Sequence, residues 1–268
     1  MSSSKKIKLV ITIIVLIVGW WSQQKENIEI SSQVPIEHPN NPDGFNYLPT
    51  STTSVIIKHN GYQLSYNEQH EQAEWVAYSL NKNDIVYNNF KRPYFINDPK
   101  VKTKSANWRS YKKSGYDRGH LCPAGDRRYS KKAHDETFYT SNISPQKHDF
   151  NAGVWNRLEQ KTRYWAKKYN NLYIVTGGIL EPNLKTIGKD KVSVPNKFYK
   201  IILDYTQPEI KAIAFLIPHK ESKSPLYNFV VTIDDIEKLT GIDFFPELPD
   251  TIENKLESSN SYKNWSFR

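Results

Sequence analysis

The sequence predicts an α+β domain, and three observations lead to that class. Strand-like segments outnumber helical ones and are separated by turn residues, as in an antiparallel sheet. One long amphipathic pattern predicts a helix that packs on the core after Asn151. The single cysteine, Cys122, excludes an intramolecular disulfide, so the fold must depend on hydrophobic burial. At 268 residues with 38% hydrophobic content, the chain has room for one sizeable domain.

Residues 1–21 have the pattern of a targeting segment. Lysines precede an apolar run from Leu9 to Trp21, and a helix of that length covers only about 20 Å of a bilayer core about 30 Å thick. The length fits a cleaved signal, whereas the bulky Trp20 and Trp21 fit an uncleaved anchor, and both alternatives stay open. We therefore predict export to the periplasm or the extracellular space, or attachment to the inner membrane through residues 5–21.

Composition divides the rest of the chain into three parts. Residues 22–46 are polar, contain three prolines and lack apolar periodicity, which predicts a linker. The globular domain is expected at residues 47–258, and residues 259–268 are expected to form a C-terminal tail.

The domain opens with a predicted β-hairpin. Residues 54–58 and 62–66 are typical of strands and are joined by Asn60-Gly61, a strong signal for a two-residue turn. Residues 75–80 predict another strand. Further strands are expected at 172–178, 197–205 and 210–218, and a short helix with a threonine cap and a glycine stop is expected at 232–241.

The long helix after Asn151 sets the geometry of a candidate metal site. Glu159 lies eight residues later, so at 100° per residue the two side chains are about 80° apart and border one side of a groove. An amide oxygen and a carboxylate are hard ligands, which suit Mg²⁺ because it keeps several of its waters. Taken alone, Asn151 is also a typical helix cap, and Glu159 a typical surface or ion-pair residue.

His120 ends the string Asp-Arg-Gly-His and has two alternative interpretations. A single histidine is more often structural than catalytic. Hydrolysis of a phosphodiester, however, needs a base that accepts a proton from water near neutral pH, and histidine suits that task. The reaction also needs positive charge on the phosphate oxygens, which Arg118 and a metal ion would supply.

Basic residues gather before and within this motif region. Between Lys91 and Lys132 the chain has an excess of ten positive charges, while its net charge is +9, so the remainder is close to neutral. Such clustering favours a polyanionic partner, with nucleic acid as the first candidate. A solvated basic face is the alternative interpretation.

Three strings in this order, DRGH, SNISPQ and FNAGVWNRLE, resemble the motifs of the DNA/RNA non-specific endonucleases. The likeness runs from about Tyr47 to about Leu256 and so covers nearly the whole domain. It implies a ββα-metal (His-Me finger) nuclease fold, in which two antiparallel strands and a helix hold the metal at their junction. A central, mostly antiparallel sheet with flanking helices would surround that motif.

The resemblance also implies roles for individual residues. His120 matches the general base, and Asn151 the one direct protein ligand to Mg²⁺, for which Mn²⁺ can substitute. Glu159 matches the acid that holds metal-bound waters. The other matching residues are Asn142, an active-site asparagine, Arg118 and Arg92, which would bind phosphate, and Asp117, whose task would be structural. Cys122 stands where many relatives have a small residue.

The resemblance implies metal-dependent, sequence-non-specific cleavage of DNA and RNA to 5′-phosphate ends, with a homodimer left open. Two other functions fit parts of the sequence. A surface protein that captures nucleic acid would need the basic stretch but neither a base nor a metal. A membrane-anchored phosphodiesterase for small substrates would share the chemistry but would have a closed pocket.

Overall fold

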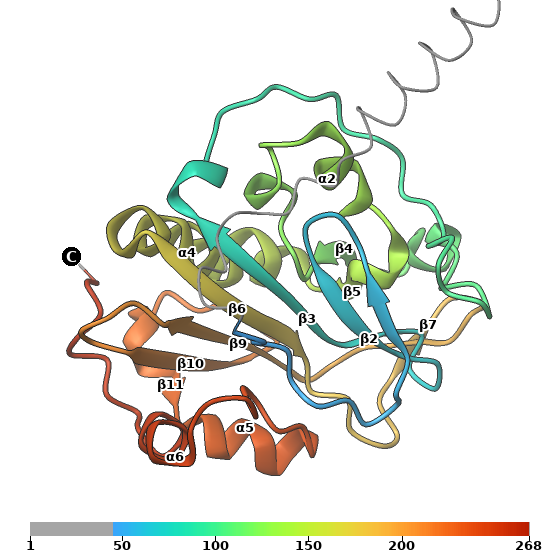
Figure 1. Ribbon diagram of the computed structural model, residues 1–268. Coiled ribbons are helices and arrows are strands. Elements are labelled where there is room, and N and C mark those ends of the chain that lie inside the picture. Colours follow the sequence, from blue (N-terminus) through green and yellow to red (C-terminus); the bar gives the residue numbers. More distant parts are fainter. Residues whose placement is uncertain (1–44, 268) are drawn as a thin grey trace, which may run out of the picture. The chain divides into compact units, whose positions relative to one another are not determined.

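The computed structural model describes residues 45–267, so the predicted targeting segment and nearly all of the predicted linker lie outside the described residues. Within this range, seven strands form one antiparallel sheet in the order β1-β2-β3-β6-β9-β10-β11 (Figure 1). Their bounds are Ile56–Lys58 (β1), Gln63–Asn67 (β2), Gln72–Asn81 (β3), Asn171–Gly178 (β6), Lys197–Asp204 (β9), Lys211–Pro218 (β10) and Val230–Val231 (β11).

Two smaller strand pairs and several helices complete the described part of the chain. The pairs are β4 (Asp117–His120) with β5 (Ile143–Gln146) and β7 (Thr186–Ile187) with β8 (Val192–Ser193). The α-helices are α2 (Lys131–Glu136), α3 (His148–Phe150), α4 (Asn156–Tyr169), α5 (Ile233–Thr240) and α6 (Asp250–Glu257). Shorter turns are η1 (Lys82–Asp84), η2 (Trp108–Tyr111), η3 (Ala124–Asp126), η4 (Thr140–Asn142), the π turn η5 (Asn151–Trp155) and η6 (Leu226–Phe229). This arrangement confirms the predicted α+β class.

The strands and caps that depend on local sequence lie where they were expected. The predicted segments at 172–178, 197–205 and 210–218 correspond to β6, β9 and β10. Thr232 caps α5 through the Asp235 N–H, and Gly241 ends that helix in the left-handed conformation (φ 69°). The predicted hairpin also forms, with Ile57 opposite Leu64, although neither Asn60 nor Gly61 has the positive φ of a type I′ turn.

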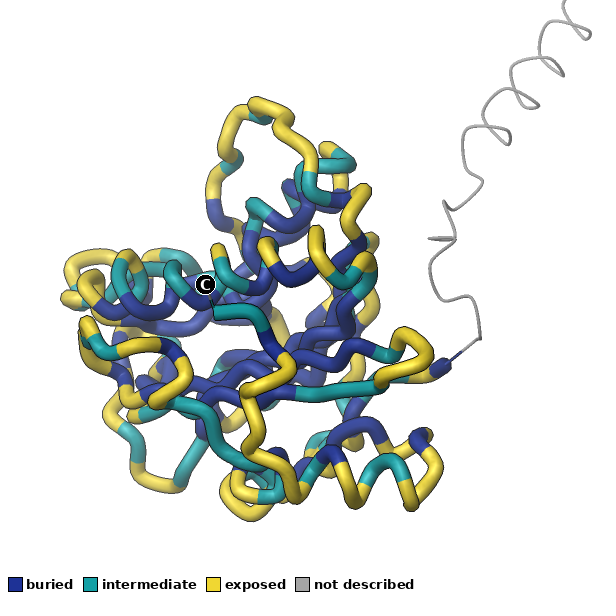
Figure 2. Tube along the Cα trace, turned by 90° about the vertical axis from the view of Figure 1, so that its left-hand side faces the viewer, coloured by how far each residue is buried: buried dark blue, intermediate teal, exposed yellow. Residues whose placement is uncertain are grey.

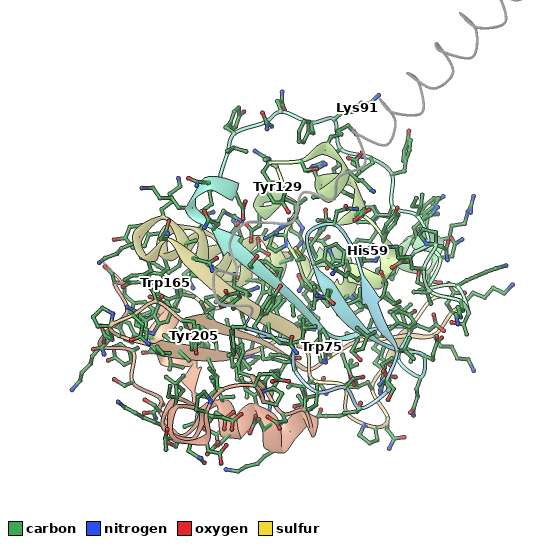
Figure 3. All side chains as sticks on the ribbon, viewed as in Figure 1. His59, Trp75, Lys91, Tyr129, Trp165 and Tyr205 are labelled. Atoms are coloured by element: carbon green, nitrogen blue, oxygen red, sulfur yellow. The ribbon has the colours of Figure 1, made fainter. Side chains whose placement is uncertain are left out.

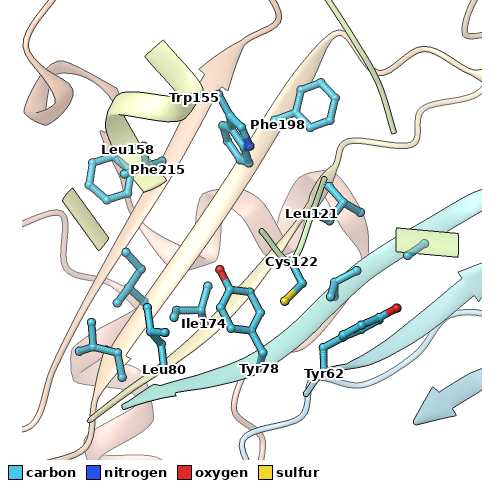
Figure 4. Packing of buried hydrophobic residues seen from close by; sticks show 14 of the residues in the cluster. Tyr62, Tyr78, Leu80, Leu121, Cys122, Trp155, Leu158, Ile174, Phe198 and Phe215 are labelled. Carbon is cyan, nitrogen blue, oxygen red and sulfur yellow. The ribbon is translucent and has the colours of Figure 1, made fainter. Parts of the chain in front are cut away.

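An apolar cluster covers each face of the large sheet. Leu158 and Trp165 of α4 belong to the first cluster, shown in close-up in Figure 4, and Ile236 of α5 and Leu256 of α6 belong to the second. Trp75, labelled with Trp165 in Figure 3, lies in the second cluster and therefore on the opposite face. Figure 2 shows the strands buried between these outer helices. Alternation along the central strands thus places α4 on one face of the sheet and α5 and α6 on the other.

Residues 259–267, which the sequence sets apart as a tail, pack against α4 and β10. The Trp265 side chain is almost completely buried, and its ring centroid lies 4.8 Å from that of Trp165. Its Nε1 donates a hydrogen bond to the Ala212 carbonyl (3.3 Å). Among the helices of residues 45–267, none has the length and apolar character that a bilayer span requires.

The C-terminal helices carry a cluster of acids that lowers stability at neutral pH. Burial, and then the charge of Glu237, raise the pKa of Glu257 from an ordinary value near 4.5 to about 8. The fold therefore disfavours the ionised form, and stability present below pH 4.5 is lost as the pH rises through about 8. We expect Glu257→Gln to unfold at a temperature about 2–4 °C higher than wild type at pH 8, equivalent to roughly 1 kcal/mol after allowance for solvent screening.

Thermal unfolding at pH 8 and pH 3 measures this effect. The gain in stability should disappear at the lower pH, where Glu257 is protonated in both states. Glu247→Gln, a change at an exposed acid before α6, is the matched control. An equal gain in that variant would show that only net charge matters.

Candidate active site

The strands β4 and β5 pair antiparallel and lead into the helical segment that starts at His148. Asp117 lies opposite Gln146, and His120 opposite Ile143. A β-carbon on Gly119 would collide with the Gln146 side chain, so only glycine allows the two strands to pair with that side chain between them. The two strands and the helical segment form the ββα arrangement that the sequence predicts.

His120 lies between two aromatic rings at the end of β4. Its ring centroid is 5.5 Å from that of Phe95 and 4.9 Å from that of Phe138. The residue is partly exposed, but Nε2 has no exposed surface and no hydrogen-bond partner among residues 45–267. Burial, and then the positive charge of Arg92, lower the pKa of His120 to about 3. The imidazole is therefore neutral at physiological pH, in the state that accepts a proton.

Two arginines flank the same aromatic residue. The Arg118 guanidinium carbon lies 4.7 Å from the Phe95 ring centroid, and that of Arg92 lies 5.4 Å from it. Arg92 is also 5.3 Å from the Phe138 ring centroid, so both rings beside His120 contact it. The structure thus brings together three residues singled out in the sequence, although Arg92 lies far upstream of the DRGH string.

Asp117 fixes the orientation of the Asn151 amide. Its Oδ2 accepts a hydrogen bond from Asn151 Nδ2 (3.0 Å) and lies 2.9 Å from His148 Nδ1. Because Asp117 holds the amide nitrogen, the Asn151 Oδ1 atom is the end left to bind a cation. Asn151 also follows α3, in helical backbone, so it does not cap the start of this helical segment. The structural task expected of Asp117 is therefore the placement of this amide.

The helical segment after Asn151 is not a regular α-helix. Residues 151–155 form a π turn, inside which Gly153 leaves helical backbone (φ −97°, ψ −109°). Glu221 occupies this break, where its Oε2 accepts the Val154 N–H (3.2 Å), and a β-carbon on Gly153 would collide with that carboxylate. The predicted angle of about 80° between Asn151 and Glu159 assumed a continuous α-helix, and that assumption is wrong.

Glu159 of α4 belongs to a group of charged side chains between this helix and the sheet. Burial raises its pKa to about 7, although the positive charges of Lys200 and Arg163 act to lower it. Lys200 projects from β9 toward α4, is fully buried, and its Nζ lies 5.1 Å from the Trp155 ring centroid. Arg163 Nη1 forms an ion pair with the buried Asp126 (2.7 Å). Two cations therefore favour the ionised form of Glu159 at a site where burial opposes it.

Asn142 lies beneath the site and not within it. Its side chain is fully buried, and Oδ1 accepts the Cys122 N–H (2.8 Å). Its Nδ2 donates to the carbonyls of Cys122 (3.0 Å) and Thr137 (2.9 Å). These bonds occupy the amide and fix the chain directly after His120, so the contribution of Asn142 is to hold the end of β4 in place.

Sequence patterns missed three members of this region. Arg163 lies four residues after Glu159, a spacing that puts both on one helix face and that could have revealed it. Lys200 is flanked by apolar and aromatic residues within β9, where a lysine is unusual and indicates a buried charge. Asp126 offers no such signal, because only the folded chain brings it to Arg163.

The comparisons with known proteins agree with this geometry. A model of the DNA/RNA non-specific endonuclease family matches residues 40–251. The chain is 36% identical over 222 residues to "Nuclease EXOG, mitochondrial" of Danio rerio, covering 76% of this chain and 65% of that protein. It is 34% identical over 230 residues to "Nuclease C1" of Cunninghamella echinulata var. echinulata, covering 78% of this chain and 90% of that protein. A chain in the crystal structure of the EndoG/EndoGI complex matches with a TM-score of 0.68 and 30% identity, over 72% of this chain and 86% of that one.

These relatives correct the predicted location. The prediction of an exported protein, periplasmic, extracellular or anchored through residues 5–21, is wrong, because the relatives from Danio rerio, Homo sapiens and Saccharomyces cerevisiae carry mitochondrial names. Residues 5–21 themselves lie outside the described residues. The homodimer stays a prediction.

Proposed function

Because the chain belongs to the DNA/RNA non-specific endonuclease family, we propose that it cleaves DNA and RNA internally, without sequence preference and with a divalent cation. The main observation behind this proposal is the position of the Asp117 carboxylate. It fixes the Asn151 amide from β4, the strand that also carries His120, so β4 links the residue that we propose as the base to the one that we propose as the cation ligand. Binding alone would need neither.

The oxygen donors at this junction fit Mg²⁺, and Mn²⁺ by the same chemistry. Asn151 Oδ1 would be the direct ligand, and Glu159 would hold water molecules bound to the cation. Few protein oxygens and several retained waters are the preference of Mg²⁺. When bound, the cation supplies a Lewis acid that stabilises charge on the phosphate and on the departing 3′ oxygen.

His120 would accept the proton of the attacking water. The water oxygen forms a bond to phosphorus while the bond from phosphorus to the 3′ oxygen breaks in line with it. The 3′ oxygen takes a proton from solvent, which leaves a 3′-hydroxyl and a 5′-phosphate. A base works best with a pKa near the working pH, and a phosphate anion bound beside His120 would raise the pKa of its imidazole from about 3.

Arg118 and Arg92 would hold the phosphate on the side of Phe95. Guanidinium groups match phosphate oxygens in geometry and remain charged. Their contact with the ring limits the rotamers of both side chains, so they lose less conformational entropy when the substrate binds. Contacts to the backbone alone would explain a lack of sequence preference.

Cleavage of both polymers in the presence of metal tests this proposal. We expect the full chain to nick supercoiled plasmid and to degrade RNA in Mg²⁺ or Mn²⁺, and to lose both activities in EDTA. The products should carry 5′-phosphates that a ligase can rejoin after nicking within a duplex. Tight, salt-sensitive binding without cleavage in either metal would contradict the proposal and favour a protein that captures nucleic acid.

A further inference from the structure

An open hollow of about 500 Å³ lies beside α4 on the side of η3 and residues 85–87. Its lining includes Arg128, Arg163 and Lys167, and no aspartate or glutamate of residues 45–267 lines it. Tyr87 and Tyr164 add aromatic surface. A concave site with several cations and aromatic rings suits a ligand with phosphate groups and flat, apolar faces.

Two of the cations that line the hollow, Arg163 and Lys167, lie on the same stripe of α4 as Glu159. Glu159, Arg163 and Lys167 are spaced four residues apart, so their side chains follow one another on the same helix face. At 1.5 Å per residue, Lys167 lies about 12 Å along the axis from Glu159, which corresponds to three or four nucleotides of B-form strand. A nucleic-acid strand that passes Glu159 and follows this stripe would therefore reach the hollow within a few nucleotides.

Two of the cations are free to bind an anion. Asp126 already holds Arg163, but no hydrogen bond or ion pair within residues 45–267 occupies the charged end of Arg128 or of Lys167. The Arg128 carbonyl accepts a hydrogen bond from Asn88 Nδ2 (2.8 Å), which ties η3 to the segment that carries Tyr87.

A second hollow, about 460 Å³ in volume, also has Tyr164 in its lining. Its cations, unlike Arg128 and Lys167, are not free to bind an anion. There Arg157 Nη2 donates to the Ser222 carbonyl (2.6 Å), and Lys161 Nζ donates to the Phe267 carbonyl (3.2 Å). Its cations are therefore engaged with backbone carbonyls, and the first hollow is the better anion site.

Tyr87 is the aromatic residue best placed to meet a base. Its side chain is 85% exposed, and the Arg128 guanidinium carbon lies 5.7 Å from its ring centroid. Burying such a ring against a flat partner is favourable, because the exposed ring gains contacts without loss of existing ones. In a duplex the bases are already stacked, so an unpaired base is the partner that Tyr87 fits.

We propose that this hollow is a nucleotide subsite, which binds a phosphate on Arg128 and Lys167 and stacks an unpaired base of DNA or RNA on Tyr87. The proposal rests on the proposed function, because it assigns the hollow to the strand that runs from the cleavage site. It makes single strands, and unpaired stretches of duplexes, the preferred substrates.

Binding of fluorescent oligonucleotides to the full chain in EDTA tests the subsite without cleavage. We expect the double variant Arg128→Gln/Lys167→Gln to bind single-stranded DNA and RNA at least about fivefold more weakly, with a salt slope lower by about 1.4 for two lost phosphate contacts. Tyr87→Ala should weaken single-strand binding at least about fivefold and leave duplex binding within about twofold of wild type.

The matched control removes two lysines from the opposite face of the sheet. Lys238→Gln/Lys255→Gln makes the same change in net charge on α5 and α6, and it should leave affinity within about twofold of wild type. An equal loss in this control would overturn the subsite, because the general field of the protein would then explain binding. Unchanged affinity in the first double variant, or an equal effect of Tyr87→Ala on duplex and single strand, would also overturn it.

A second substrate separates failure of the subsite from failure of the proposed function. Bis(p-nitrophenyl) phosphate is a diester with no neighbouring nucleotides that could occupy the hollow. If wild type in Mg²⁺ hydrolyses neither this diester nor plasmid nor RNA, the proposed nuclease function is wrong, and the result of the oligonucleotide binding assay does not change that conclusion. If wild type cleaves and the variants bind single strands normally, only the subsite is wrong.

Discussion

We expect replacement of His120 with alanine to lower the rate of plasmid and RNA cleavage about a hundredfold to ten-thousandfold, the range that a general base contributes. The imidazole is neutral in the free protein, so it is in the state that can accept a proton. Arg118 and Arg92 remain in the variant, so substrate binding should stay near that of wild type. Single-turnover cleavage with saturating Mg²⁺, beside binding in EDTA, measures the two effects separately.

His120→Gln is the matched variant, because glutamine fills a similar space between Phe95 and Phe138 but cannot serve as a base. Added imidazole should partly restore cleavage in the alanine variant, which leaves room for it, and not in the glutamine variant. Near-normal cleavage by either variant, with folding verified by circular dichroism, would show that another group activates the water.

Replacing Asn151 with alanine should remove nearly all cleavage, because the variant loses the direct ligand that we propose for the cation. Loss of the amide also leaves Asp117 without one of its two partners, so part of the local order is lost as well. The activity should not recover at higher Mg²⁺ concentrations. A titration of plasmid nicking against Mg²⁺ and Mn²⁺ measures this, and recovery to wild-type rates at high metal would contradict a direct ligand.

Asp117→Asn tests the same proposed cation site by a milder change than Asn151→Ala. An amide at this position can also donate, so it no longer selects one orientation of the Asn151 side chain. We expect the metal concentration for half-maximal cleavage to rise about 10–100-fold, the usual effect of losing a residue that orients a ligand. His148→Ala removes the other contact to the same carboxylate oxygen and should have a smaller effect.

Much of the fold follows from local patterns. Apolar runs in β6, β9 and β10, and the threonine and glycine that bound α5, specify their elements with nearby residues alone. The π turn at Gly153 does not follow from local sequence, because it accommodates Glu221 from a segment 67 residues away from Val154. Contacts between distant segments therefore decide the irregular part of the helix that borders the site.

Local sequence likewise predicts one part of the candidate site, and contacts between distant segments determine the other part. The DRGH string and the helix after Asn151 mark His120, Asn151 and Glu159, since their residue types and spacing point to the chemistry. Arg92 reaches His120 only because Phe95 and Phe138 pack around the imidazole ring, which is a tertiary event. The ion pair between Asp126 and Arg163 likewise forms only when the folded chain brings η3 to α4.

Because Cys122 is buried, the folded domain should not react with thiol reagents. The side chain is fully buried beside Tyr78, as Figure 4 shows, and burial raises the pKa of its thiol to about 12. Alkylating reagents attack the thiolate, so this thiol stays inert while the protein is folded. As the chain has no other cysteine, a single substitution such as Tyr87→Cys or Lys238→Cys creates a unique attachment point for a maleimide dye. Fluorophores can thus be placed at the hollow or on the opposite face without removing a native residue from the core.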